Sequence, residues 1–276
     1  MDVKDFEKYL NYIGEGKTLE AECLRVRDIP NVLIKHFSLG NDEDENNKRF
    51  YSLENNMLWF SDISLLNDPY EFKGMVINEE AFKNAGYPDD SIKIYRDFLE
   101  MKDYGVVCFS ARDVNYLPMW AYYTNNHAGY CVEYEIGNKF CIHQVMYEPK
   151  RIPIANLLIQ MKDAIMQVYS EGKDRSPKCD RIVTIIRQNL YIKAESWKHE
   201  MEYRIAAPIT NDKGENICIS NFGLKVKRII AGINCPEKHL ERLNEISNEI
   251  GCGNIFISEL SNIEYGMEIK PYKKEN

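Results

Sequence analysis

The stretch EYRIAA (202–207) is followed along the chain by NICIS (216–220) and LKVKRIIAGI (224–233), with only short polar segments between them. Each run is rich in apolar or β-branched residues and is bounded by residues that favour turns, which is typical of a strand. In a parallel βαβ arrangement, helices would separate such strands. The three runs therefore argue against a doubly wound α/β fold.

Outward from these runs, strand-like and helix-like segments are mixed without a regular repeat. This mixture favours an α+β fold with mixed, mostly antiparallel sheets and flanking helices. We expect a central pair of sheets, with helices at 154–169 and 181–194 packed beside them. Further strands are expected at 32–36, 57–60, 104–109, 129–136, 141–147, 254–260 and 265–270, and further helices at 78–102, 118–125 and 237–250.

The length of 276 residues favours one large domain that spans 1–276. Apolar residues at helical spacing, among them Phe6, Leu10 and Ile13, predict an N-terminal helix over about 1–25 as an appendage to this domain. The segment 40–48 is so rich in Asp, Glu and Asn that we expect an exposed loop there.

Composition and charge narrow the classes of function. The formal net charge of −8 repels a phosphate backbone, which counts against general nucleic-acid binding. No apolar run approaches the roughly 20 residues that span a bilayer, and the start MDVKD lacks the layout of a signal peptide. The eight cysteines include no Cys-x-x-Cys pair, which predicts free thiols and no structural metal. We therefore expect a cytoplasmic protein that does not contact a membrane.

Several common catalytic signatures are absent from the chain. It contains no Gly-x-x-x-x-Gly-Lys-Ser/Thr loop, no Gly-x-Gly-x-x-Gly, no Gly-x-Ser-x-Gly and no His-Glu-x-x-His. This argues against a P-loop nucleotide hydrolase, a Rossmann dehydrogenase, an α/β-hydrolase and a zincin protease.

Four segments have unusual residue content. They are LWFS (58–61) with LNDPYE (66–71), CFS (108–110) with MWAYY (119–123), NHAGYCVEY (126–134), and SWKHEMEYR (196–204). In content and order they resemble the uncharacterised bacterial domain-of-unknown-function family 2971, over roughly residues 31–270. That family has no settled function. Because unusual residues in separate segments most simply share one site, we expect 58–71, 108–123 and 196–204 to meet in space.

The chain is also similar to the ADP-ribosyltransferase superfamily, including its DNA-targeting toxin branch. That superfamily places a His or Arg on an early strand, an aromatic-Ser/Thr element on the next and a catalytic Glu on a later one. Here His36, Phe109-Ser110 and Glu202 have that order. The resemblance implies an ADP-ribosyltransferase-like fold, NAD as a small nucleotide substrate, and no metal. It implies an NAD-dependent mono-ADP-ribosyltransferase or NAD glycohydrolase of toxin or phage-defence type, with an unknown acceptor macromolecule.

The chemistry of this reaction needs particular residue types. Cleavage of the nicotinamide–ribose bond builds positive charge on the ribose, which a nearby carboxylate stabilises. The resemblance gives this catalytic role to Glu202. Glu200, two residues earlier on a segment that we expect to be extended, would face the same side and orient the acceptor. The expected cofactor-binding residues are His36 and Ser110 on the ribose, Trp120, Tyr123 or Tyr122 stacked on the nicotinamide ring, and Asn67, Asp68 and Glu71.

These residues also have structural interpretations, which the sequence leaves open. A non-catalytic ligand-binding module of a bacterial defence or toxin system could use the same cleft as a sensor. A nucleic-acid-processing enzyme is a third hypothesis, against which the acidic net charge counts. The structural alternatives are an ion pair of Glu202 with Arg204, an ion pair of Glu71 with Arg204 or Arg112, a core histidine with satisfied nitrogens at His36, a strand end at Ser110, core anchors at Trp120 and Trp197, and a turn at 67–69 that caps nearby backbone.

Overall fold

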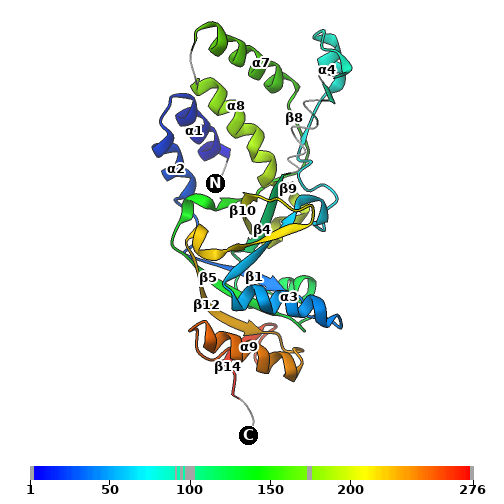
Figure 1. Cartoon of the computed structure of the whole chain (residues 1–276), viewed down its shortest axis with the longest axis vertical. Coiled ribbons are helices and arrows are strands. Elements are labelled where there is room, and N and C mark those ends of the chain that lie inside the picture. The colour runs from blue at the N-terminus through cyan, green and yellow to red at the C-terminus, as the bar shows by residue number, and fades with distance from the viewer. Residues whose placement is uncertain (1–2, 91, 94–95, 97–102, 173–175, 274–276) are drawn as a thin grey trace.

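A computed structural model describes residues 3–90, 92–93, 96, 103–172 and 176–273. A ten-stranded sheet runs through the middle of the molecule, with one group of helices above it and another below it (Figure 1). Neighbouring strands along its main path are antiparallel except β12 and β13, so the predicted α+β class with mostly antiparallel pairing is confirmed. The strands of this sheet are β1 (Val32–Phe37), β2 (Met57–Asp62), β4 (Tyr104–Ser110), β5 (Tyr130–Ile136), β6 (His143–Gln144), β10 (Glu202–Pro208), β11 (Gly214–Cys218), β12 (Leu224–Ala231), β13 (Phe256–Leu260) and β14 (Met267–Pro271).

Strand β4 is the point at which this sheet branches. Strand β10 pairs with the whole of one edge of β4, from Glu202 opposite Ser110 to Pro208 opposite Tyr104. On the other edge, β2 pairs only near Gly105, and β1 pairs only at Ser110. The stretch of β4 between these two contacts therefore borders a gap between β1 and β2. Because β4 belongs to both halves, the expected pair of separate sheets is wrong, and one branched sheet takes its place.

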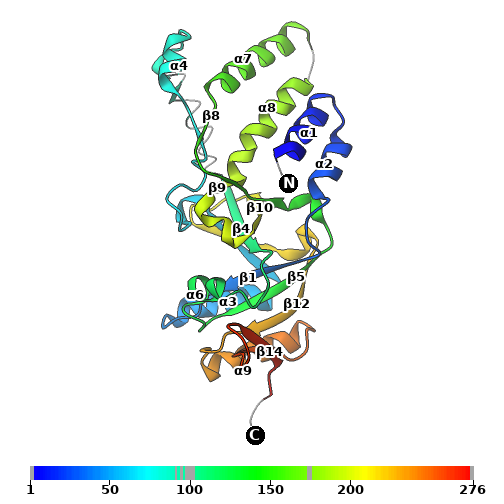
Figure 2. The same cartoon turned by 180° about the vertical axis from the view of Figure 1, so that it is seen from behind.

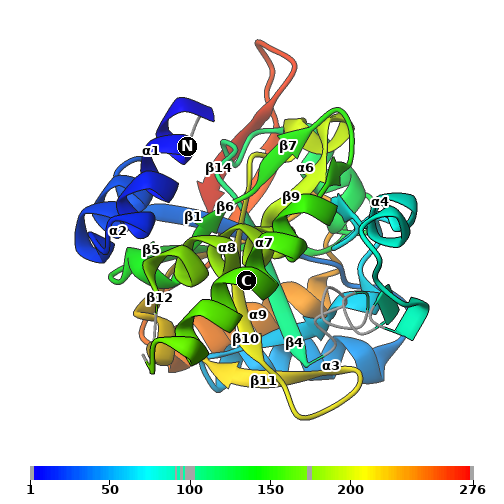
Figure 3. The same ribbon diagram turned by 90° about the horizontal axis from the view of Figure 1, so that it is seen from above.

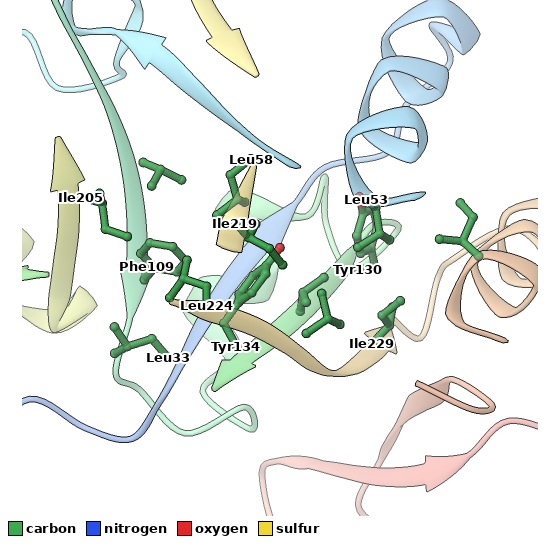
Figure 4. Packing of buried hydrophobic residues seen from close by; sticks show 14 of the residues in the cluster. Leu33, Leu53, Leu58, Phe109, Tyr130, Tyr134, Ile205, Ile219, Leu224 and Ile229 are labelled. Carbon is green, nitrogen blue, oxygen red and sulfur yellow. The ribbon is translucent and has the colours of Figure 1, made fainter. Parts of the chain in front are cut away.

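The two faces of the branched sheet differ in chemistry. Side chains alternate between the faces of a strand. Leu33, Phe109 and Ile205 therefore share one face, where they pack in the main core with residues of β5 and β12 (Figure 4). Ser110 and Glu202 alternate with these residues along β4 and β10 and are turned to the opposite face. Polar side chains of β4 and β10 thus lie on the face away from the main core.

Helices cover both ends of the molecule. Helices α3 (Glu43–Glu54) and α9 (Glu237–Glu249) add Leu53 and Leu243 to the main core at the lower end. At the upper end, α7 (Ala155–Ser170) and α8 (Pro177–Arg187) build a second core with α4 (Glu79–Asn84), which contributes the buried Phe82. Two short parallel pairs join this layer to the sheet: β3 (Met75–Val76) with β8 (Ile152–Pro153), and β7 (Met146–Glu148) with β9 (Ile192–Ala194).

The N-terminal segment forms two helices, α1 (Val3–Gly14) and α2 (Thr18–Val26), where the sequence predicted one. Their buried faces pack on each other and on Ile185 of α8. From above, α1 and α2 lie on one side of α8 and α4 lies on the other (Figure 3). The guanidinium of Arg25 on α2 donates to the carbonyls of Phe140 and Ile142, which ties these helices to the sheet region.

The predicted helices at 154–169, 181–194 and 78–102 agree with the structure to different extents. Helix α7 lies where 154–169 was predicted. The predicted helix 181–194 is wrong beyond Arg187, because η3 (Gln188–Tyr191) follows and β9 then pairs with β7. Of the predicted helix 78–102, α4 is observed, and residues 91, 94–95 and 97–102 lie outside the described residues.

The predicted loop at 40–48 is also wrong, because α3 begins at Glu43. The side chain of Asp42 caps the helix by accepting a hydrogen bond from the backbone N–H of Glu45. The acidic first turn then interacts favourably with the positive end of the helix dipole. Polar residues that suggested a solvated loop are thus the start of a helix whose apolar face comes later, at Phe50 and Leu53.

None of the helices in the described part of the chain combines the length and the apolar character that crossing a membrane requires. All eight cysteines are free thiols.

Candidate functional site

A cavity of about 170 Å³ lies at the gap where the sheet branches. Its walls come from β1, β2, β4, α6 (Leu117–Tyr123), β9, η4 (Glu195–Glu200) and β10, and from the loop after η1 (Ile63–Leu65). In Figure 2 the ribbons of β4, β9 and β10 lie between α7 and α8 above and α9 below. The segments 58–71, 108–123 and 196–204 therefore meet in space. The polar residues that line the cavity are Lys35, His36, Ser61, Asn67, Glu71, Cys108, Ser110, Tyr123, Lys193, Glu200 and Glu202.

A buried group of charges, which we call the carboxylate cluster, forms one wall of this cavity. It consists of Glu71, Glu200 and Glu202 with the cations Lys193 and Arg204. The ammonium of Lys193 lies 2.7 Å from Glu200 Oε2, 2.9 Å from Glu202 Oε2 and 3.5 Å from Glu71 Oε1. Arg204 donates from Nε to Glu202 Oε1 at 2.6 Å and from Nη2 to Glu71 Oε1 at 2.8 Å. The two ion pairs of Arg204 that the sequence left open are both present.

The charges of the cluster shift the pKa values of its members. Burial disfavours the charge of Glu202, but Arg204 and Lys193 outweigh it and lower its pKa from 4.5 to about 2. Burial also disfavours the charges of Lys193 and Arg204, yet Glu202 and its neighbours raise the pKa of both cations. Glu202 is therefore firmly ionised and firmly held.

Glu71 behaves in the opposite way. Burial raises its pKa, and the lowering influence of Arg204 does not cancel this. Its Oε1 accepts from Arg204, whereas its Oε2 is buried without a hydrogen-bond partner among the described residues. Buried carboxylate oxygens are normally bonded, so this oxygen can accept a hydrogen bond from a ligand. Glu71 combines a free acceptor with the raised pKa that suits proton transfer.

His36 is a second unsatisfied group at the same cavity. Both of its ring nitrogens are buried and lack hydrogen-bond partners in the described part of the chain. Burial, together with the charge of Lys35, lowers its pKa to about 3, so the imidazole is neutral and offers one donor and one acceptor. Its ring meets the edge of Trp120 at a centroid distance of 5.4 Å. The interpretation of His36 as a satisfied core histidine is therefore wrong.

Three other predicted residues at the cavity are already engaged. The hydroxyl of Tyr123 donates to Glu200 Oε1, and Asn67 Nδ2 lies 3.5 Å from the same hydroxyl. The hydroxyl of Ser110 donates to the carbonyl of Glu200 at 2.6 Å and accepts from the N–H of Arg112 at 3.0 Å. Ser110 thus fixes the backbone that carries Glu200, while Tyr123 orients the Glu200 carboxylate.

Three residues that were expected at the site do not line the cavity: Trp120, Asp68 and Tyr122. Trp120 is fully buried behind His36 and donates from Nε1 to the carbonyl of Val114 at 2.6 Å. Asp68 accepts from the N–H of Tyr70 at 2.8 Å, which is the capping role that the turn interpretation predicted. Trp120 is a core anchor and Asp68 stabilises a turn, so neither is placed to touch a ligand in this cavity.

Left-handed backbone conformations flank all three carboxylates. Met201, between Glu200 and Glu202, has a φ of 47°, and Phe72, next to Glu71, has a φ of 57°. Such angles are unfavourable for residues with a Cβ and cluster at functional sites. The expected extended segment at 200–202 is wrong, because Glu200 ends η4 and Met201 reverses the chain. That reversal is what brings both carboxylates to Lys193.

We expect Met201→Gly to be more stable than Met201→Ala, with a free energy of unfolding that is higher by about 1 kcal/mol. At ordinary positions alanine is the more stabilising of the two, because glycine loses more backbone entropy on folding. Here the left-handed φ reverses that order, and both variants remove the same partly exposed side chain. Urea denaturation of the two variants measures the difference. A more stable alanine variant would show that the backbone at 201 is not strained.

Sequence reasoning missed Lys193, Lys35 and Cys108 as residues of the site. Lys193 was assigned to a helix, but in β9 it lies opposite Tyr147 and reaches the carboxylates. The Nζ of Lys35 lies 3.4 Å from the Cys108 carbonyl at the gap beside β4, and burial lowers its pKa. Burial, together with the charge of Glu202, raises the pKa of the Cys108 thiol, so this thiol stays protonated. A lysine between apolar residues, as in Tyr191-Ile192-Lys193-Ala194, was the available signal for a buried cation.

The cluster also predicts how stability depends on pH. The pKa of Glu202 is about 2 in the folded protein and 4.5 as its reference value, so the unfolded chain binds more protons between these pH values. The stabilisation from ionised Glu202 is therefore present above pH 4.5 and is lost as the pH falls towards 2. We expect Glu202→Gln to show a shallower loss of unfolding free energy across this range, measured by urea titration at several pH values. Equal slopes for the two proteins would contradict the assignment.

The described residues contain no group of three or more His, Cys, Asp and Glu side chains arranged to hold a metal ion. Comparison with known proteins adds no relative: no protein-family model, no curated protein and no solved structure matches the chain.

Proposed function

We propose that this cavity is the active site of an NAD-dependent mono-ADP-ribosyltransferase or NAD glycohydrolase of toxin or phage-defence type. One observation carries the proposal. Glu202 is the register partner of Ser110, and Ser110 is the register partner of Ile34, so the three form a row across β10, β4 and β1. His36 lies two residues beyond Ile34 on the same face. The three elements of the superfamily pattern thus stand side by side at one cavity.

The size of the cavity is compatible with one end of NAD. A cavity of about 150 Å³ can bind benzene, so the cavity of about 170 Å³ has room for one ring-sized group. The nicotinamide ring with the edge of its ribose is such a group. The remainder of the dinucleotide would extend through the mouth of the cavity.

The residues present are suited to cleavage of the nicotinamide–ribose bond. As that bond breaks, its electron pair stays on the nicotinamide nitrogen, and the positive charge moves to the ribose. The carboxylates of Glu202 and Glu200, which line the cavity, stabilise this charge. Glu71, through its free Oε2, is placed to accept the proton of the attacking water or acceptor hydroxyl. Neutral His36 is available to hydrogen-bond the ribose or the carboxamide.

A second function, a non-catalytic ligand-binding module, is favoured by one specific observation. Both oxygens of Glu202 are already occupied, by Arg204 Nε at 2.6 Å and Lys193 Nζ at 2.9 Å. A carboxylate whose charge is neutralised by two cations stabilises a developing cation less. In that case the same cavity would bind its ligand through His36 and Glu71 without cleaving it.

Release of nicotinamide separates the two functions. The full chain is incubated with NAD, with and without candidate acceptors, and free nicotinamide is quantified by chromatography, while NAD binding is measured by calorimetry. Turnover supports the enzyme, and binding without turnover supports the module. If NAD is neither bound nor cleaved, both proposals for this cavity are wrong.

A further inference from the structure

Three aromatic side chains form a ladder that leads out of the carboxylate cluster to the surface. The ring of Trp197 lies 4.7 Å from the ammonium of Lys193, which belongs to the cluster. Trp197 stacks on His199 at a centroid distance of 6.1 Å and an interplanar angle of 26°, and His199 meets Tyr122 edge-on at 6.3 Å. Tyr122 ends the ladder in solvent with 66% of its surface exposed. We call Trp197, His199 and Tyr122 the aromatic ladder.

The ladder adjoins the cavity through its neighbours in sequence. Tyr122 precedes Tyr123, which lines the cavity, and His199 precedes Glu200, which does the same. Tyr122 therefore exposes a large apolar surface beside a polar cavity. Among the described residues, the ring partner of Tyr122 is the edge of His199. In addition, His199 Nε2 is buried without a hydrogen-bond partner among the described residues, so the ladder also has an unused polar atom.

The cationic side chain of Arg112 lies beside the aromatic ladder. The Nε of Arg112 donates to the carbonyl of His199 at 2.5 Å, and its guanidinium lies 4.7 Å above the ring of Tyr116. These contacts hold the guanidinium next to the ladder while the side chain remains partly exposed. A fixed guanidinium is well suited to bind phosphate oxygens.

We propose that the aromatic ladder binds the adenine of NAD, with Arg112 at the pyrophosphate, while the nicotinamide end fills the cavity. This inference rests on the proposed function. A dinucleotide carries two flat ring systems joined by phosphates, and the cavity has room for only one of them. The ladder supplies a stacking surface for the second. Arg112 contacts both sites, because its backbone N–H bonds Ser110 of the cavity and its Nε bonds the carbonyl of His199 in the ladder. The net charge of −8 favours a short ligand with two phosphates over a polynucleotide.

The substitution Tyr122→Ala tests this subsite. We expect it to weaken NAD binding by about tenfold, as removal of a base-stacking ring does elsewhere. Binding of nicotinamide mononucleotide, which lacks the adenine, should stay within about twofold of wild type. Tyr122→Phe keeps the ring and should keep the affinity for NAD. Tyr169→Ala, which removes an exposed tyrosine from α7, is the matched control and should change neither affinity.

The alternative results are distinct. If wild type binds NAD and Tyr122→Ala does not weaken it, the ladder is not the adenine site, although the proposed function stands. Equal losses for NAD and the mononucleotide would also overturn the inference, because Tyr122 would then act through the cavity. Tighter, Tyr122-dependent binding of a single-stranded oligonucleotide would reassign the ladder to nucleic acid. If wild type binds no NAD, the proposed function and this inference fail together.

Discussion

Replacing Arg204 by methionine is expected to lower the free energy of unfolding by about 3–5 kcal/mol, the usual cost of removing one partner from a buried ion pair. Arg204 is fully buried and bonds Glu202, Glu71 and the carbonyl of Leu190. Without it, Lys193 is the one cation of the cluster that remains for its three buried carboxylates. Methionine fills a similar space, so the loss reports the missing charge more than a missing volume. Equilibrium urea unfolding measures it.

Two further variants sharpen this prediction. Arg228→Met breaks a comparable pair with Glu133 on the same sheet, at 2.6 Å, but Arg228 is 31% exposed, so we expect a loss of about 1 kcal/mol or less. Adding Glu202→Gln to Arg204→Met should recover part of the stability, because it removes one of the two orphaned charges. If Arg204→Met loses no more than Arg228→Met, Lys193 alone compensates the carboxylates and the cluster is weaker than its geometry indicates.

Glu202→Gln is expected to reduce the rate of nicotinamide release by about a hundredfold or more. A carboxylate that faces a developing cation in a site closed to water stabilises the transition state by several kcal/mol, and each ~1.4 kcal/mol is a tenfold change in rate. Glutamine keeps the shape of the side chain and removes its charge. Nicotinamide release per folded molecule, at a temperature where both proteins are fully folded, is the measurement.

Because Glu202 also holds the cluster together, the control must lose a buried carboxylate elsewhere. Glu133→Gln does so on β5, where Glu133 is 5% exposed and pairs with Arg228 outside the cavity. We expect this control to be less stable than wild type but equally active. If Glu202→Gln retains the wild-type rate, the carboxylate that matters is Glu71 or Glu200, and Glu71→Gln becomes the decisive variant. If both Glu202→Gln and the control lose activity equally, the effect comes from stability.

The strands of the main sheet could be predicted from the sequence because their signal is local. Runs such as Val106-Val107-Cys108-Phe109 are apolar and bounded by turn residues, and β4, β5, β10 and β12 lie where such runs were found. The same local reasoning failed at 40–48, where the cap at Asp42 and the acidic first turn are helix signals that composition alone obscured.

At 188–194 the local pattern was insufficient for a different reason. The apolar periodicity of α8 continues past Arg187, but Ile192 pairs with Met146, 46 residues earlier in the chain. A hydrogen-bonded partner that distant leaves no periodic signal of its own, so tertiary pairing overrides the helical pattern there. The placement of Lys193 in the site depends on this pairing.

The sequence by itself determined the α+β class, the identity of most strands, and the segments that meet at the cavity, because alternation and unusual residue content are properties of short stretches. Only the tertiary structure decided that the sheet branches at β4, that Lys193 and Arg204 join three glutamates in one cluster, and that Met201 turns the chain so that Glu200 and Glu202 converge. These features depend on register between distant strands and on a φ that only surrounding contacts can impose. Among the described contacts of the carboxylate cluster, Glu71 Oε2 is buried without a hydrogen-bond partner.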